Sequence, residues 1–263
     1  MGARKIAFIN ANGLKFIAAF FMLIDHFGFI FYPEVAIFRI LGRISMPLFA
    51  FAISEGCRYT RNKTKHFFLL FALALLCQIV YYFFDDGSLY LSILITFSLS
   101  VLTIYALQFF KKCVFEKAAW WKTTIALLLF CGSVAFAYFI SSPYMQRRGV
   151  ALDYGFWGVM LPVFASLFDF RRIHTPAFLQ KCDRIWVRLI PFTIGLLLLA
   201  LSLHPSVSDG LPTFLPFYAF LAMPILLLYN GEKGKWKTKY FFYIFYPMHL
   251  ALLEGLYMYL YLL

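Results

Sequence analysis

Apolar residues in this chain occur in runs of about 20, separated by short polar segments. A run of that length, wound as a helix, spans the roughly 30 Å hydrocarbon core of a bilayer. The pattern therefore predicts an all-α, polytopic membrane bundle of about nine transmembrane helices, within a range of roughly eight to ten. The predicted spans cover residues 14–32, 36–57, 66–84, 89–110, 119–140, 150–168, 186–204, 211–229 and 240–262.

Two of these spans are irregular. The second carries several charged residues, and we expect Pro47 to bend or split it, because an interior proline removes a backbone hydrogen bond. The sixth is short and contains Pro162. These two spans are the least regular parts of the predicted bundle.

Composition and charge support a membrane protein. Hydrophobic residues make up 63% of the chain and charged residues only 14%, too little to cover a soluble domain. The net charge of +12 would suit nucleic acid, but Lys and Arg fall in alternate short loops and not on one basic face. This positive-inside pattern predicts an inside amino terminus and no nucleic-acid partner. The basic loops span residues 58–65, 111–117, 171–188 and 233–239.

Nothing in the chain indicates a metal site or a second domain. The five cysteines are scattered and form no CxxC pair or His/Cys ligand spacing, so we expect no disulfide framework and no metal. No repeat or linker divides the chain, and its longest soluble connection covers only residues 169–185. We therefore expect one transmembrane domain over residues 1–263, with any function housed between helices.

The first span carries polar residues at its centre. Asp25 and His26 lie where a charge costs on the order of 2.5–3.5 kcal/mol. Lys15 precedes His26 by eleven residues, which places both on one helix face to within about 20°. Histidine suits general-base chemistry near neutral pH, whereas Asp25 lies about 100° away and is expected to pair with a basic residue of another helix. The alternative is a polar cluster that only fixes helix register.

Arg39 and Arg43 lie four residues apart in the second span and share a helix face. Guanidinium groups in a membrane helix need anions, which Asp25, Glu55 or a bound anionic group would supply. For Arg39 we favour the alternative that its side chain extends to the lipid headgroups, and for Arg43 we favour function. Glu55 has a simple alternative role in a local pair with Arg58.

A basic rim follows the second span, at the predicted cytoplasmic side. It contains Arg58, Arg61, Lys63 and Lys65. Such a rim either determines topology alone or also attracts a phosphorylated cosubstrate.

His249 is a second candidate, in the last span. Pro247 lies two residues earlier and leaves a backbone carbonyl without its usual partner, which can create a polar pocket in lipid. Tyr243 and Tyr246 lie close by in sequence. A lone histidine on an apolar helix is more often structural, so the two interpretations are balanced.

Three motifs in these segments resemble the TraX family, membrane proteins named for the F-plasmid pilin acetylase. The resemblance is dense over residues 14–65 and 236–252 and thin between them. The Lys15-x10-His26 spacing also looks like the basic-x10-His motif of the wider membrane acyltransferase families. The motifs are Ile24-Asp25-His26, Gly42-Arg43-x-x-x-Pro47-x-Phe49 and Tyr246-Pro247-x-His249-Leu250.

The resemblance implies an N- or O-acyltransferase of a bacterial plasma (inner) membrane. An acyl group, usually acetyl, would pass from cytosolic acyl-CoA to an amine or hydroxyl of a peptide, glycan or small molecule, with no metal. His26 would be the base or acyl carrier, Asp25 would orient or balance it, Lys15 would belong to the donor path, and direct transfer and an acyl-histidine intermediate both stay open. The candidate substrate- or donor-binding residues are Lys15, Arg39, Arg43, Glu55, Arg58, Arg61, Asn62, Tyr246 and His249.

Two other functions fit the same residues. A secondary transporter would use Asp25, His26 and Arg43 as a relay, but transporters commonly show two related halves, and here the polar residues gather at the two ends of the chain. A non-catalytic membrane assembly protein would use the same residues only to tie helices together.

Overall fold

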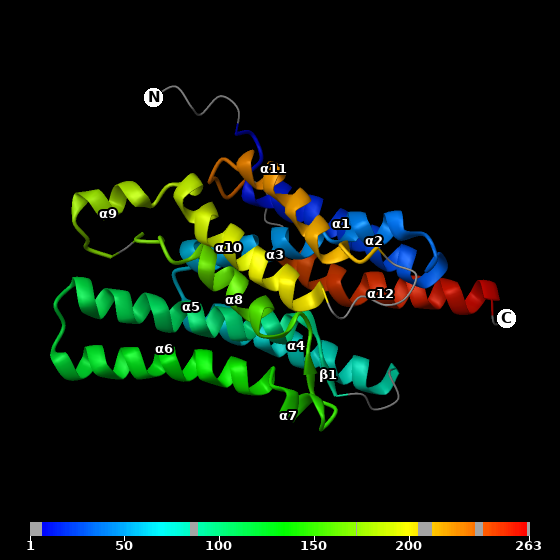
Figure 1. Ribbon diagram of the computed structural model, residues 1–263, viewed down its shortest axis with the longest axis horizontal. Helices are drawn as coiled ribbons and strands as arrows, with labels where there is room; N and C mark the ends of the chain where they lie inside the picture. Colours follow the sequence, from blue (N-terminus) through cyan, green and yellow to red (C-terminus); the bar gives the residue numbers. More distant parts are fainter. Residues whose placement is uncertain (1–6, 85–88, 172, 205–211, 235–238, 262–263) are drawn as a thin grey trace. The chain divides into compact units, whose positions relative to one another are not determined.

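The computed structural model describes residues 7–84, 89–171, 173–204, 212–234 and 239–261 (Figure 1). These residues form helices with one minimal sheet, which confirms the predicted all-α membrane bundle. The elements are α1 (Ala11–Phe31), α2 (Ala36–Gly42), α3 (Ser45–Tyr59), α4 (Lys63–Phe84), β1 (Tyr90–Leu91), α5 (Ile93–Phe115), α6 (Trp120–Ile140), α7 (Pro143–Gln146), β2 (Ala151–Leu152), α8 (Gly155–Ala165), α9 (Ala177–Cys182), α10 (Ile185–Leu203), the 3-10 helix η3 (Leu215–Leu221), α11 (Ala222–Leu227) and α12 (Lys239–Tyr261).

Within the described residues, five helical segments are long and apolar enough to cross a membrane. They are Ala11–Phe31, Ala36–Tyr59, Ile93–Phe115, Trp120–Ile140 and Ile185–Leu203. Helix α8 has 11 residues and reaches only about 16 Å, half the hydrocarbon thickness. The count of nine spans therefore stays a prediction. The inside amino terminus also stays a prediction. The charge pattern behind it depends partly on segments outside the described residues, namely 1–6, 85–88, 205–211 and 235–238.

The second predicted span is split, as expected, but not at the proline. Helix α2 ends at Gly42 and α3 begins at Ser45, so the break lies at Arg43 and Ile44. Pro47 falls in the first turn of α3, where its missing N–H costs no helical hydrogen bond. The hydroxyl of Ser45 donates to the Ala18 carbonyl of α1 at 2.8 Å, which fixes the start of α3.

The chain forms two compact units whose boundaries fall inside α3 and α10. The terminal unit contains the described residues of 1–52 and 196–263, and the central unit contains those of 53–195. The expectation of one functional domain over 1–263 stays a prediction.

In the terminal unit, α1 packs against both α2 and α12 (Figure 1). The approach of α1 to α2 requires glycine at two points. A Cβ on Gly28 would overlap the Phe38 side chain, and a Cβ on Gly42 would overlap the Asp25 carboxylate. Polar groups at the middle of α1 are therefore held directly against the backbone of α2.

In the central unit, α5 contacts α4, α6 and α8 (Figure 1). The sequence pattern predicted helix from residues 89 and 150, but β1 and β2 pair in parallel there instead, with Tyr90 opposite Ala151. The Gln78 side chain of α4 explains part of this correction, because it donates to the Tyr90 carbonyl at 2.7 Å and accepts from the Ser92 N–H at 3.0 Å. These contacts satisfy backbone groups that a helix would have paired internally.

Candidate active site

The structure brings the two candidate histidines together in the terminal unit. His26 of α1 and His249 of α12 are separated by 223 positions in sequence, yet His26 Nδ1 lies 3.1 Å from His249 Nε2. The ring centroids are 4.9 Å apart. His249 is buried and His26 is partly buried. An imidazole pair held between two apolar helices is the central feature of this site.

The surroundings of His249 hold its ring in place. Its Nδ1 lies 2.8 Å from the Phe245 carbonyl, one turn earlier on α12. The Phe245 ring stacks on the imidazole at a centroid distance of 4.9 Å and an interplanar angle of 7°. The Tyr246 ring, a predicted substrate-binding group, also packs against His249 at 5.9 Å. These three contacts together restrict rotation of the His249 side chain.

Asp25 points toward α2 and not toward the histidines. Arg39 Nη1 donates to Asp25 Oδ1 at 2.7 Å, which confirms that Asp25 pairs with a basic residue of another helix. The favoured interpretation of Arg39 as a headgroup contact is wrong, because its guanidinium is partly buried, bonds Asp25 and lies over the Phe29 ring at 5.2 Å. Gly42 leaves the space that this carboxylate occupies.

Arg43 lies beside this ion pair. Its charge also acts on Asp25, and its buried Nε has no hydrogen-bond partner among the residues that the structure describes. Lys15 lies farther along α1, with its Nζ 5.8 Å from the centroid of the Phe242 ring of α12. The terminal unit therefore holds Lys15, Arg39, Arg43 and the histidine pair along the contacts that α1 makes with its neighbours.

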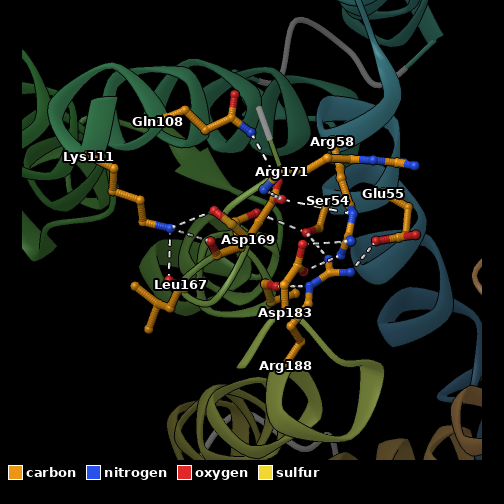
Figure 2. A network of polar contacts seen from close by, with 12 residues as sticks. Ser54, Glu55, Arg58, Gln108, Lys111, Leu167, Asp169, Arg171, Asp183 and Arg188 are labelled. Atoms are coloured by element: carbon orange, nitrogen blue, oxygen red, sulfur yellow. Dashed lines mark hydrogen bonds and ion pairs between the residues drawn. The ribbon is translucent and has the colours of Figure 1, made fainter. Parts of the chain in front are cut away.

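Glu55 and Arg58 belong instead to a buried polar network in the central unit (Figure 2). The ion pairs of both side chains are formed with residues far away in the sequence, so the local Glu55–Arg58 alternative does not account for them. The Glu55 carboxylate pairs with Arg188 Nη1, while Arg58 pairs with Asp183 at 2.7 Å. Arg188 was assigned to a basic loop, but it lies inside α10 and is fully buried. Its position, one turn into an apolar run, is the sequence signal that could have revealed it.

The Arg188 guanidinium joins three segments of this network. Its Nε donates to the Ala165 carbonyl at 3.0 Å, and its Nη2 donates to Ser54 Oγ at 3.3 Å. Ser54 and Ser166 share a hydrogen bond of 2.8 Å. Because the desolvation of a buried guanidinium is costly, these partners are what allow Arg188 to remain charged there.

Lys111 occupies the other side of the same network (Figure 2). It was assigned to a loop, but it is a buried residue of α5. Its Nζ donates to the carbonyls of Ser166, Leu167 and Asp169 at 2.8, 2.8 and 3.2 Å. These carbonyls belong to the segment that follows α8, so the ammonium group holds this segment against α5.

Asp183, in the connection between α9 and α10, is the acidic partner of Arg58 in this network. Burial raises the pKa of the Asp183 carboxyl above its ordinary value, and the Arg58 guanidinium lowers it in part. Arg58 Nη2 donates to Asp183 Oδ2 at 2.9 Å, and its Nε lies 3.9 Å from Asp169 Oδ1. Arg58 is therefore occupied by two carboxylates of its own unit.

The remaining predicted residues lie at the start of α4. Arg61 is exposed, and the exposed Asn62 accepts the Lys65 backbone N–H at 2.9 Å through its side-chain oxygen. Asn62 therefore caps this helix. Among the described residues, no group of three or more His, Cys, Asp or Glu side chains could hold a metal ion.

These features define a multi-pass, helical integral membrane protein with a histidine pair and a charged pair between its helices. Its sequence matches the profile of the TraX protein family over residues 10–257. The chain belongs to the TraX family, and the resemblance noted in its motifs is confirmed.

Two relatives illustrate this similarity. The "Probable fimbrial assembly protein FimC, serogroup H1" of Dichelobacter nodosus is 27% identical over 274 residues, which cover 95% of this chain and 96% of the relative. The "Uncharacterized protein RP591" of Rickettsia prowazekii (strain Madrid E) is 46% identical over 52 residues, which cover 20% of this chain and 21% of that protein. No solved structure matches the chain.

Proposed function

We propose that this protein is a membrane acyltransferase that moves an acyl group, in the first instance acetyl, from cytosolic acyl-CoA to an amine or hydroxyl acceptor. The contact between His26 and His249 carries the proposal. Imidazole is the side chain best suited to accept a proton near neutral pH. A pair of them between apolar helices lies where polar groups are costly and commonly functional.

The proposed direct reaction has one transfer step. His26 accepts the proton of the acceptor amine or hydroxyl while that nitrogen or oxygen attacks the thioester carbonyl carbon. The new C–N or C–O bond forms, the C–S bond breaks, and the CoA thiolate takes the proton from His26. In the alternative route, His26 itself attacks the thioester carbonyl carbon, the C–S bond breaks and the CoA thiolate leaves. The acyl group then passes from the His26 nitrogen to the acceptor, and the acceptor's proton goes to the thiolate.

The neighbouring cations have matching roles in this proposal. Attack on the thioester creates a negative charge on the carbonyl oxygen, and preorganised donors stabilise such a charge strongly in a dry site. The buried Nε of Arg43 has no hydrogen-bond partner within the described parts of the chain, so Arg43 is the proposed donor. Arg39 is bonded to Asp25, and this pair balances charge. Lys15, on the same helix as His26, would attract the phosphates of the donor.

Incubation of purified protein with radiolabelled acetyl-CoA and a panel of amine and hydroxyl acceptors tests this function. His26→Ala should abolish label transfer while the protein still inserts in the membrane. His174→Ala, which changes an exposed loop histidine, is the matched control and should transfer label normally. Full transfer by the His26 variant would contradict the assignment, and failure of the wild type to bind acetyl-CoA would contradict the donor.

A second candidate function is fimbrial assembly without catalysis. It is favoured by the name of the Dichelobacter nodosus relative, whose match covers almost the whole chain. An acyltransferase acting on a surface-fibre component would also satisfy that name. The two functions differ in the His26→Ala variant: assembly alone predicts intact fimbriae if the variant folds, whereas assembly dependent on catalysis predicts their loss.

A further inference from the structure

His249 is bonded on both sides of its ring, and this determines where its proton lies. A backbone carbonyl can only accept a hydrogen bond, so the Phe245 carbonyl, 2.8 Å from His249 Nδ1, requires a proton on that nitrogen. A neutral imidazole carries one N–H. The Nε2 of neutral His249 therefore presents a lone pair.

The same reasoning extends to His26. His249 Nε2, as an acceptor, requires a donor at 3.1 Å, and His26 Nδ1 is the atom there. The proton of neutral His26 is then on Nδ1, which leaves the lone pair on Nε2. We infer that His249 and the Phe245 carbonyl fix the tautomer of His26, so that His26 Nε2 is the basic atom. The assignment of the tautomer rests on geometry alone. The role of His26 Nε2 as a catalytic base rests on the proposed function.

The assignment makes His249 a positioning residue. It does for His26 what a carboxylate does for the histidine of a hydrolase triad, holding one tautomer and one ring orientation. Asp25, the neighbouring carboxylate, bonds Arg39 of α2 instead. The stacked Phe245 ring keeps the His249 imidazole in the orientation that this relay needs.

One other acceptor competes for the His26 proton. The backbone of Met22, one turn earlier on α1, also interacts with the His26 ring. If that contact alone held the proton on Nδ1, loss of His249 would leave the tautomer unchanged. The contribution of His249 is therefore measurable separately from that of α1.

Nitrogen-15 NMR of the full-length protein, labelled at histidine, measures the tautomer directly. The His26→Ala variant identifies the His26 signals among those of the five histidines. Three substitutions are compared: His249→Gln places an acceptor oxygen near the former Nε2, His249→Asn reaches only the former Nδ1, and His249→Leu supplies no acceptor. We expect a protonated Nδ1 on His26 in the wild type and the Gln variant, and a mixture of tautomers in the Asn and Leu variants.

Transfer of label from acetyl-CoA is measured on the same samples. The Asn and Leu variants should lose activity by roughly 100-fold or more, which is the contribution of a correctly placed base. The Gln variant should be at least about tenfold more active than either of them. A wild-type His26 protonated on Nε2, or an unchanged His26 tautomer in the Asn and Leu variants, would overturn the inference. Equal activity losses in the Gln and Asn variants would also overturn it. A wild type with the expected tautomer but no transfer with any acceptor would contradict the proposed function and leave the tautomer assignment standing.

Discussion

Substitution of Glu55 by Gln removes one charge from a buried ion pair and leaves the other in place. The Glu55 and Arg188 side chains are only 3% and 2% exposed. Neutralising one partner of a buried pair typically costs about 3–5 kcal/mol, because the remaining charge loses its compensation. The Ser54 hydroxyl and Ala165 carbonyl still accept from Arg188, so we expect the lower half of this range.

A matched control lies in the same unit. Glu116→Gln breaks the pair that Glu116 forms with Lys112 at 3.8 Å on the surface of α5, where the two side chains are 36% and 59% exposed. Exposed pairs at this spacing are worth about 0.3–0.5 kcal/mol. The double variant Glu55→Gln with Arg188→Met removes both buried charges and should recover much of the lost stability, because no uncompensated charge remains.

Three of the five cysteines supply the assay, once Cys131 and Cys182, which are not buried, are replaced by Ser in every sample. Cys57, Cys77 and Cys113 are buried free thiols of the central unit, so they react with a thiol-specific dye only after unfolding. In a thermal scan in detergent, about 3 kcal/mol corresponds to a midpoint lowered by roughly 6–12 °C. Equal midpoints for the Glu55 and Glu116 variants would refute the reasoning that burial makes the Glu55–Arg188 pair important.

Hydrogen exchange of the α1 and α2 amides tests Gly42, because all five cysteines belong to the central unit. Gly42→Ala should speed this exchange because its Cβ would overlap the Asp25 carboxylate, whereas Gly255→Ala of the same unit, with nothing within 4 Å, should leave it unchanged. In the thermal scan, Lys111→Met removes a donor from three carbonyls, of which Ser166 O still accepts the Asp169 N–H, and it should cost about 1–3 kcal/mol. Its control Lys112→Met, at an exposed position, should change the midpoint little, and equal effects within either pair would contradict the geometry.

The sequence predicted the helices well and the buried charges poorly, for one physical reason. Length and hydropathy are local properties, so an apolar run identifies a helix without its neighbours. The rule that places Lys and Arg in loops assumes that they find no partner in the membrane interior. Lys111 and Arg188 break this assumption, because their partners come from other segments: Glu55 is 133 positions from Arg188. No local pattern contains that partnership.

In the candidate site, too, the sequence predicted the individual residues but not their partners. Asp25, His26 and His249 were each identified from a polar residue in an apolar run. The type of partner expected for Asp25 was also correct, since it required only the cost of an unpaired charge in lipid. Which arginine it meets depends on where α2 crosses α1, and the meeting of His26 with His249 depends on how α12 packs. Both depend on tertiary packing, which the periodicity of a single segment does not predict.

Asp25 and His26, both of α1, have partners on two different helices, and this determines the charge of the site. Were Asp25 bonded to His26, the carboxylate would favour a protonated imidazole, which cannot act as a base. Arg39 bonds the carboxylate instead, and His249 offers His26 a neutral partner. The charges of this ion pair cancel, and Arg43 adds a positive charge beside it. A neutral base with a neighbouring cation is complementary to the proposed reaction, in which a proton leaves the acceptor while negative charge develops on a carbonyl oxygen.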